Sequence, residues 1–193
     1  HWRHHKFGGI RPFFCQVEAV ETAIWLSEVA PQSKSGKRLL EHLANANKDA
    51  NPELMRFALK LATGAGKTTV MAMLIAWQTL NKLASPQDGR FTDAFLIVTP
   101  GITIRDRLRV LLPNDADNYY RKRDLVPAPL RDKLTQAKII ITNFHGFQLR
   151  EVSGGSRFTK EMAGQIESGV SKETPDQMVR RVCRELGNKK NII

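Results

Sequence analysis

The spacing of apolar residues predicts two helices in the first quarter of the chain. Between residues 14 and 29, Val17, Val20, Ile24 and Trp25 recur at the three- to four-residue spacing of one helix face. Pro31 ends this amphipathic helix, because proline cannot continue it. The composition then predicts, in order, a loop over 31–37, a helix over 38–47 and a turn over 48–52.

Two apolar stretches flank the next loop, which contains two glycines. The short run 55–61 predicts a strand. The stretch from Thr68 to Lys82 carries apolar side chains around most of its helical circumference, which predicts a helix buried between two layers. Strand, glycine loop and helix in this order aim a helix N-terminus at a bound phosphate.

Strands and helices alternate in the rest of the chain. Continuous apolar runs at 94–98 and 139–141 predict two buried parallel strands. Helices are expected at 103–112, 130–137 and 176–186, a turn-rich excursion without a fold of its own at 113–120, a mobile Gly- and Ser-rich segment at 151–174, and the start of a further strand at 191–193. The alternation predicts an α/β fold with a parallel sheet and flanking helices.

The loop between the two apolar stretches has the chemistry of a phosphate-binding loop. Residues 61–69 read Leu-Ala-Thr-Gly-Ala-Gly-Lys-Thr-Thr, with Leu61 where the usual motif opens on Gly or Ala. Gly64 and Gly66 allow the backbone to turn its N–H groups toward phosphates, Lys67 reaches the β and γ phosphates, and the Thr68 hydroxyl ligates Mg²⁺. Thr63, Ala65 and Thr69 complete the predicted binding segment for a nucleotide such as ATP.

Composition narrows the partners and the compartment. The chain of 193 residues has 30 Lys and Arg against 19 Asp and Glu, a net charge of +11 that favours a polyanion such as nucleic acid. A solvated basic surface is the alternative. Cys15 and Cys183 have no zinc-ligand spacing and predict no disulfide, which favours a reducing, cytoplasmic setting. No apolar stretch is long enough to span a bilayer.

Four motifs in order carry a family resemblance. They are Arg11-Pro-Phe-Phe-Cys-Gln16, Leu61-Ala-Thr-Gly-Ala-Gly-Lys-Thr68, Ile97-Val-Thr-Pro-Gly101 and Ile141-Thr-Asn-Phe-His145. From Arg11 to Ile193 the chain resembles the first RecA-like lobe of superfamily-two helicases and translocases. It is most similar to the restriction subunit of type III restriction enzymes and to related DEAD/DEAH-box-like proteins. The resemblance implies an N-terminal helical segment with an adenine-recognition motif and an insertion over 1–54, followed by a partial P-loop lobe over 55–193.

The resemblance also implies roles for individual residues. Gln16 would recognise the adenine edge, for which an amide both donates and accepts; a helix-surface glutamine is the alternative. Arg11 would either assist the nucleotide or pair with a carboxylate, and the second is preferred. Lys67 and Thr68 would be the catalytic contacts to ATP and Mg²⁺. Contacts to the nucleic-acid backbone would come from two sets, Thr99, Pro100 and Gly101, and Thr142, Asn143 and His145. A strand-to-helix turn and a helix cap are the structural alternatives for these sets.

An acidic Asp-Glu-x-His motif of the family is absent from the sequence. By resemblance it would follow the strand that starts at 191–193, so the chain is expected to be a piece of a longer motor that binds ATP weakly without hydrolysing it. The implied parent is an ATP-dependent DNA translocase or helicase of a restriction endonuclease, with a modification or specificity subunit as partner and RNA left open as the polymer. The alternatives are a nucleic-acid-binding module with a vestigial nucleotide site and a P-loop kinase of a small metabolite.

Overall fold

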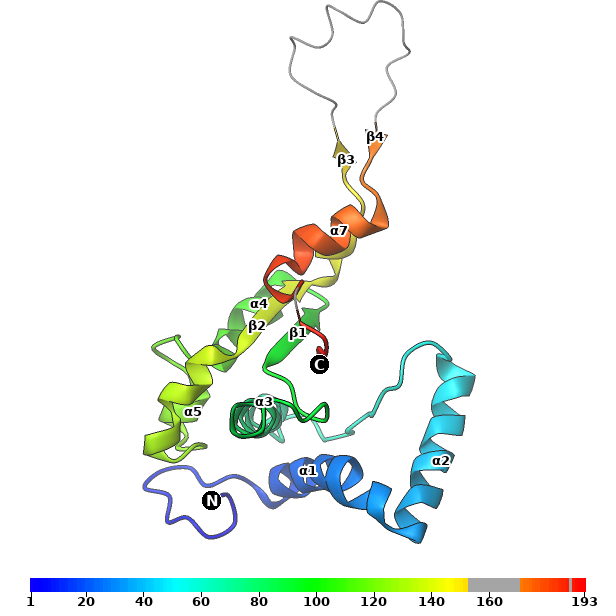
Figure 1. The fold of residues 1–193 in the computed structure, drawn as a ribbon. Coiled ribbons are helices and arrows are strands. Elements are labelled where there is room, and N and C mark those ends of the chain that lie inside the picture. The colour runs from blue at the N-terminus through cyan, green and yellow to red at the C-terminus, as the bar shows by residue number, and fades with distance from the viewer. Residues whose placement is uncertain (153–170, 188) are drawn as a thin grey trace, which may run out of the picture. The chain divides into compact units, whose positions relative to one another are not determined.

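The computed structural model describes residues 1–152, 171–187 and 189–193, and these form two compact units. The first unit contains residues 1–93 and 110–137, and the second contains residues 94–109 and 138–193. Figure 1 labels their helices and strands in chain order. Helices together with a parallel sheet confirm the predicted α/β class. None of the helices in the described ranges has the length and apolar character needed to cross a bilayer.

In the first unit, helix α1 (Phe14–Ile24) packs on helix α3 (Lys67–Ala84). The predicted helix over 14–29 changes pitch after Ile24, first to a π turn (Trp25–Val29) and then to a 3-10 turn (Ala30–Gln32). Helix α3 covers the range predicted for it. The shared core is apolar and includes Val17, Val20, Val70, Ala72, Met73, Ile75 and Ala76. Burial of these side chains supplies the main stabilisation of the pair.

Helix α2 (Lys34–Ala50) is longer than the 38–47 predicted for it. It starts early because Ser33 caps it, with the side-chain oxygen accepting from Gly36 N at 3.0 Å. The predictions of a loop over 31–37 and a turn over 48–52 are therefore wrong for most of those residues. Gly36 is the only buried residue of α2, so the helix is held mainly through its first turn.

The strand predicted at 55–61 is not formed. These residues have no regular structure, and Met55 and Phe57 are exposed. A strand needs a neighbour to bond its N–H and C=O groups. Within the described residues of the first unit there is no strand that could serve as that neighbour.

The excursion after residue 112 is a packed part of the first unit, contrary to the prediction of a segment with no fold. It contains the short helix α5 (Tyr119–Lys122), whose Tyr120 is fully buried and donates its hydroxyl to Leu111 O at 2.8 Å. Leu125, Val126 and Leu134 are also buried. In place of the helix predicted at 130–137 there are two 3-10 turns, Ala128–Leu130 and Asp132–Gln136.

The second unit contains the parallel strands β1 (Ala94–Thr99) and β2 (Lys138–Asn143), with Ala94 opposite Lys138 and Thr99 opposite Asn143. On the other side of β1, Ile193 N donates to Ala94 O at 3.1 Å and Leu96 N donates to Ile193 O at 2.7 Å (Figure 1). Residues 191–193 do not form the predicted strand, but Ile193 pairs with β1 in a parallel arrangement. Strand β2 is half-buried rather than buried as predicted.

Helices follow both strands of the second unit. Helix α4 (Ile102–Arg107) follows β1 and continues as a 3-10 turn (Leu108–Leu111), which together cover the helix predicted at 103–112. Helix α7 (Pro175–Val182) and a 3-10 turn (Arg184–Leu186) replace the single helix predicted at 176–186.

The predicted mobile segment 151–174 has ordered ends. Strand β3 (Glu151–Val152) pairs antiparallel with β4 (Ser171–Lys172), and Thr174 caps α7. The prediction for residues 153–170 lies outside the described residues.

We predict that Gly36→Ala destabilises the first unit. A Cβ at this position would lie 2.3 Å from Ala30 O and 2.5 Å from Ala30 Cα, both backbone atoms that cannot rotate away. Alanine is otherwise the better helix former, so the expected loss of unfolding free energy is about 1–2 kcal/mol. Urea unfolding followed by tryptophan fluorescence measures it. Gly8→Ala is the control, since nothing lies within 4 Å of its added Cβ; equal midpoints for the two variants would contradict the prediction.

Candidate functional site

The loop before α3 has the backbone conformation of an anion-binding loop. Gly64 (φ 83°) and Gly66 (φ 74°) both lie in the left-handed region, which favours glycine. Gly66 is the N-cap of α3, so Lys67 and Thr68 are its first two residues. The first amides of a helix have no acceptor within it and carry the positive end of the helix dipole. The loop therefore presents backbone donors where a phosphate would be bound.

The side chains of the loop are open to solvent at its start and buried at its end. Thr63 and Lys67 are exposed, Ala65 and Thr68 are half-buried, and Thr69 is buried. The Lys67 ammonium donates to Ala62 O at 2.8 Å, which holds the side chain against the loop. The seven residues of the predicted binding segment, 63–69, thus form the loop and the first turn of α3.

Gln16 is seated on this loop although 49 positions separate it from Ala65. Its Nε2 donates to Ala65 O at 2.8 Å, and its Oε1 accepts from Phe13 N at 3.0 Å. Only 3% of Gln16 is exposed, so it is not the helix-surface glutamine of the alternative interpretation. A side-chain amide has a second N–H and a second lone pair on oxygen. Recognition of adenine by these groups stays a prediction.

Gly66 approaches the Gln16 amide closely, since a Cβ there would lie 2.3 Å from Gln16 Nε2. A side chain at position 66 would therefore displace the Gln16 amide from Ala65 O, and the left-handed φ of Gly66 independently favours glycine.

A pocket opens beside Gln16, at the buried side of Thr69. Its lining comes from the residues before α1, from α1, from α3 and from the turn after α5: Ile10, Arg11, Pro12, Phe13, Gln16, Thr69, Arg123 and Leu125. Arg11 donates to Arg3 O at 3.4 Å and forms no ion pair with a carboxylate among the described residues, contrary to the preferred interpretation. The pocket lining combines apolar residues with two arginines, Arg11 and Arg123.

Arg123 is a pocket residue that the motifs did not indicate. Its Nη1 donates to Thr69 Oγ1 at 3.1 Å, and its Cζ lies 4.0 Å from the centroid of the Tyr119 ring. The ring and the hydroxyl together fix the guanidinium at the pocket. The signal in the sequence is the aromatic and basic run Tyr119-Tyr-Arg-Lys-Arg123, in the segment for which no fold was predicted.

The second unit brings the two other motifs together at the carboxyl ends of its strands. Thr99 and Asn143 are register partners, so the turns that follow them start side by side. Pro100 is exposed, and Gly101 is the N-cap of α4. Thr99 itself is buried, with its hydroxyl donating to Gly101 O at 3.0 Å and Thr142 O at 3.3 Å. A phosphate contact by this hydroxyl stays a prediction and requires a different rotamer.

After β2 the chain makes a 3-10 turn (Phe144–Phe147) that exposes two rings. Asn143, rather than His145, caps the turn by accepting from Gly146 N at 3.0 Å. His145 is exposed and its Nδ1 lies 3.3 Å from Gln148 Nε2. Thr142 is half-buried beneath the turn, and a Cβ at Gly146 would lie 2.7 Å from its Oγ1. Phe144 belongs to the same motif but was not among its predicted contact residues, and its side chain is 63% exposed.

Arg181 of α7 ties this turn to the rest of the second unit. Its guanidinium donates to both oxygens of Glu173 at 2.8 Å, to Gly146 O at 3.1 Å and to Gln148 O at 3.2 Å. This ion pair lowers the pKa of Glu173 to about 2, chiefly through the hydrogen bond from Arg181, and the amide of Arg150 also contributes. We call these contacts the Arg181 clasp.

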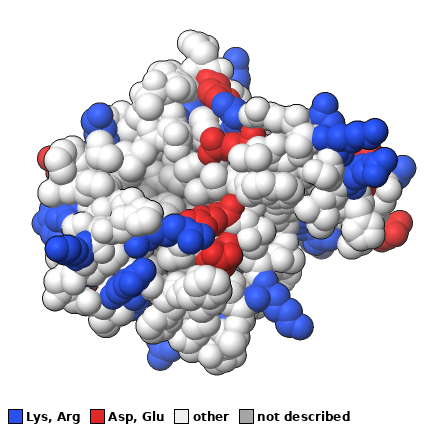
Figure 2. Space-filling view, turned by 90° about the horizontal axis from the view of Figure 1, so that it is seen from below, with Lys and Arg blue, Asp and Glu red and all other residues white. Residues whose placement is uncertain are grey.

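Basic side chains are exposed in several places on the face drawn in Figure 2. In the second unit, Arg105 and Arg107 lie in the last turn of α4, which follows Gly101. Arg180 and Arg184 are exposed on α7 and on the turn after it. The excess of basic residues behind the net charge of +11 is therefore at least partly exposed, where these side chains can contact a polyanion.

Comparison with known proteins identifies a family for the chain. The family model described as type III restriction enzyme, res subunit, matches residues 12–175 of the 193. No curated protein and no solved structure matches the chain.

We predict that Glu173→Gln weakens the Arg181 clasp in a pH-dependent way. The folded pKa of Glu173, about 2, lies below its ordinary value of 4.5. Its ionisation therefore stabilises the fold above about pH 4.5, and this contribution is lost as the pH falls toward 2. Amide hydrogen-exchange protection in α7 should be lower in Glu173→Gln at pH 7, with the difference from wild type shrinking over that range.

Glu185→Gln serves as the matched control for the clasp, since this exposed carboxylate lies just beyond α7. Its protection factors should follow those of the wild type at every pH. A constant difference between wild type and Glu173→Gln from pH 7 to pH 2 would show that ionisation of Glu173 does not hold the clasp.

Proposed function

Since this chain belongs to the family of type III restriction enzyme res subunits, we propose that it is the ATP-binding lobe of an ATP-dependent DNA translocase. The family has a RecA-like P-loop fold and is part of the helicase-like ATP hydrolases. The observation that carries the proposal is the seating of Gln16 on the glycine loop. It places an amide, two guanidinium groups and a helix N-terminus around one pocket.

The residues of the loop fit a nucleotide triphosphate with Mg²⁺. Gly64 and Gly66 both have left-handed φ, and the amides at the start of α3 are donors for anionic oxygens. Lys67 would leave Ala62 O to neutralise charge on the β and γ phosphates, as a point charge rather than a base. Thr68 would supply a hydroxyl ligand to Mg²⁺, which adds charge compensation during phosphoryl transfer.

The base would lie against Gln16 at the pocket beside the loop, which has room for about one water molecule and would have to widen to admit a base. Gln16 retains one N–H and one lone pair, enough to pair with an adenine edge that both accepts and donates. Arg123 is held over Tyr119 and against Thr69, so its guanidinium is fixed before the nucleotide arrives. Pre-organisation of this kind lowers the entropy loss on binding.

The strand ends of the second unit would contact DNA. The backbone N–H groups of Gly101 and Ile102, which follow Thr99 and Pro100, and the side chains of Thr142, Asn143 and His145 suit phosphate contacts. Such contacts position the DNA backbone but carry no sequence information. Phe144 adds an exposed ring on which an unpaired base can stack. The basic residues of α4 and α7 add attraction that depends on salt.

In the proposed motor, nucleotide binding and DNA binding are coupled through closure of this lobe on a second one. A modification or specificity subunit would supply sequence recognition. We expect this chain to bind ATP without turnover, because its acidic candidates Glu173, Asp176 and Glu185 do not follow an apolar strand. Glu173 is already paired with Arg181. Turnover that is lost in Lys67→Ala would overturn this expectation.

We predict that Arg123→Ala weakens binding of ATPγS with Mg²⁺ about 10-fold and that Lys67→Ala weakens it by about 10-fold or more. Each substitution removes a charge-assisted contact of about 1.5–3 kcal/mol, and each 1.4 kcal/mol is a factor of ten in affinity. Isothermal titration calorimetry on the three proteins measures the effect.

Arg121→Ala is the control for the nucleotide experiment, because Arg121 is a neighbouring exposed arginine of α5 that does not line the pocket. It should bind ATPγS like the wild type. Equal losses of ATPγS affinity in Arg121→Ala and Arg123→Ala would show that the loss comes from the lower net charge and not from a pocket contact. Unchanged binding in Lys67→Ala would reject the nucleotide site itself.

We predict that Phe144→Ala weakens binding of single-stranded DNA about 10-fold at every salt concentration. Stacking of one base on an aromatic ring contributes about 1–3 kcal/mol. Because phenylalanine has no charge, the slope of log K against log salt should not change. Fluorescence anisotropy with a labelled oligonucleotide measures both quantities, without ATP and with it.

Phe14→Ala provides the comparison, since Phe14 is another exposed phenylalanine but lies on α1. Its DNA affinity should equal that of the wild type. A changed salt slope in Phe144→Ala, or an equal loss in Phe14→Ala, would contradict the stacking role. Salt-sensitive DNA binding together with no ATPγS binding would favour a nucleic-acid module with a vestigial nucleotide site.

A further inference from the structure

Two histidines of the N-terminal arm, which we define as residues 1–7, meet an aspartate of the turn after α5. His1, His5 and Asp124 each offer one ligand atom, and these atoms lie within 4.8 Å of one another. His5 Nε2 lies 2.5 Å from Asp124 Oδ2, and His1 Nε2 lies 2.7 Å from Asp124 O. The two imidazole rings are 4.2 Å apart between centroids. Two imidazole nitrogens and a carboxylate oxygen are thus close enough together to surround one metal ion.

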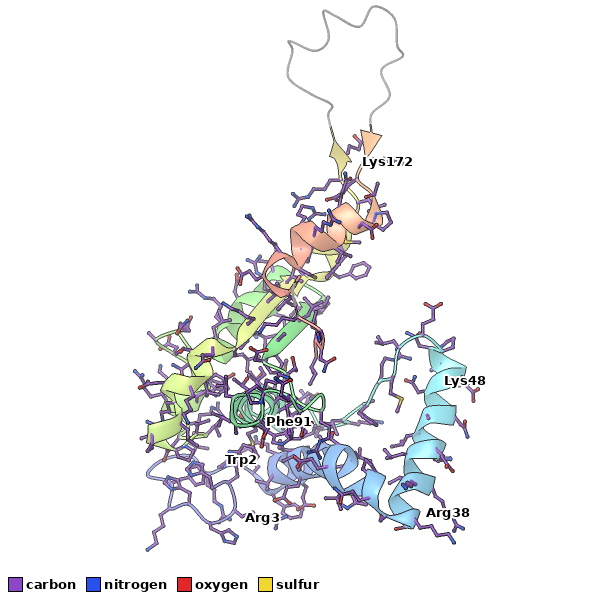
Figure 3. The ribbon with its side chains drawn as sticks, in the orientation of Figure 1. Trp2, Arg3, Arg38, Lys48, Phe91 and Lys172 are labelled. Atoms are coloured by element: carbon purple, nitrogen blue, oxygen red, sulfur yellow. The ribbon has the colours of Figure 1, made fainter. Side chains whose placement is uncertain are left out.

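The arm that carries the histidines is attached to the first unit at two further places. Trp2 Nε1 donates to Leu125 O at 2.8 Å, and Arg3 forms ion pairs with Glu18, at 3.0 Å, and with Glu21 of α1. Figure 3 labels Trp2 and Arg3 in this arm. The positions of His1 and His5 therefore do not depend on their contacts with Asp124 alone.

We propose that His1, His5 and Asp124 form a binding site for Zn²⁺ or a similar divalent transition metal. Two histidines and one carboxylate are an established ligand set for zinc, with the remaining position taken by water or another oxygen. At zinc bond lengths of about 2.0–2.1 Å, tetrahedral ligands lie roughly 3.3 Å apart. The ligand atoms now lie within 4.8 Å of one another, so metal binding would draw them closer; His1 and His5 are exposed and Asp124 is half-buried.

The surroundings of Asp124 support its role as a ligand. Arg131 Nη2 donates to Asp124 Oδ1, which leaves Oδ2 for the metal, and a ligating carboxylate is commonly held by such a second partner. Asp124 is also the one residue other than glycine with positive φ, 49°, in the described part of the chain. Aspartate and asparagine tolerate this conformation.

The site would link the N-terminal arm to the turn that lines the pocket. Asp124 lies between Arg123 and Leu125, both of which line it. A bound metal would replace two hydrogen bonds, His5 to Asp124 Oδ2 and His1 to Asp124 O, by stronger coordination bonds. The site does not depend on what occupies the pocket.

Calorimetric titration of the chain with ZnCl₂ at pH 7.5 tests the proposal. For the titration the protein is expressed with one Met added before His1, so that the His1 nitrogen lies in a peptide bond and cannot chelate a metal together with the His1 ring. We expect one equivalent to bind, reversibly by EDTA, and to raise the thermal midpoint of unfolding. His5→Ala and Asp124→Asn should each weaken binding by more than about 10-fold. Asp124→Asn keeps both the side-chain size and the tolerance of positive φ.

His4→Ala is the matched control, because His4 belongs to the same arm but not to the group of three. It should bind Zn²⁺ with wild-type affinity and a 1:1 ratio. Equal weakening in His4→Ala, more than one equivalent of weak binding, or full affinity in Asp124→Asn would overturn the proposal. Circular dichroism and thermal melts without metal show whether each variant is folded. Binding of Co²⁺, read from its visible absorption, gives a second measure of the same ligand set.

Discussion

The contact between Gln16 and the glycine loop is the constraint on which the first unit depends. The amide of Gln16 occupies the space that any side chain at position 66 would need, and it donates to the carbonyl of Ala65. Helix α1 is thereby joined to the start of α3, and the apolar faces of the two helices pack below that joint. The loop conformation, the burial of Gln16 and the pocket lined by Arg11 and Arg123 follow from one tight approach.

In the second unit, the parallel pairing of β1 with β2 is the interaction on which the position of the candidate site depends. Because β1 and β2 run in the same direction with Thr99 opposite Asn143, their last residues end at the same edge of the sheet. The Arg181 clasp then holds the 3-10 turn after β2 through two backbone carbonyls. A single arginine with a buried carboxylate partner thus sets the position of Phe144 and His145 from α7, more than 30 residues further along the chain.

Some parts of this fold followed from local sequence, and others did not. The almost wholly apolar face of α3 and the Ile-rich run of β2 are strong local signals, and both elements formed. The run 55–61 has a comparable signal but no strand, because a ladder needs a neighbour and none is described in its unit. The segment around Tyr120 shows the opposite case. Its buried residues are separated by turns, so they do not recur at the spacing of a helix or a strand. The segment is held in place by burial of the Tyr120 ring and by the hydrogen bond from its hydroxyl to Leu111 O.

Sequence alone predicted the phosphate-loop chemistry, and the family resemblance carried by its ordered motifs is confirmed by the family match over residues 12–175. Those features depend on residue type and local spacing, since glycines adopt positive φ and a lysine follows them directly. Tertiary structure alone decided that Gln16 is buried on the loop, that Arg123 lines the pocket beside it, and that His1 and His5 meet Asp124. Each of these joins residues 49 or more positions apart, and only packing of the intervening chain determines such distances.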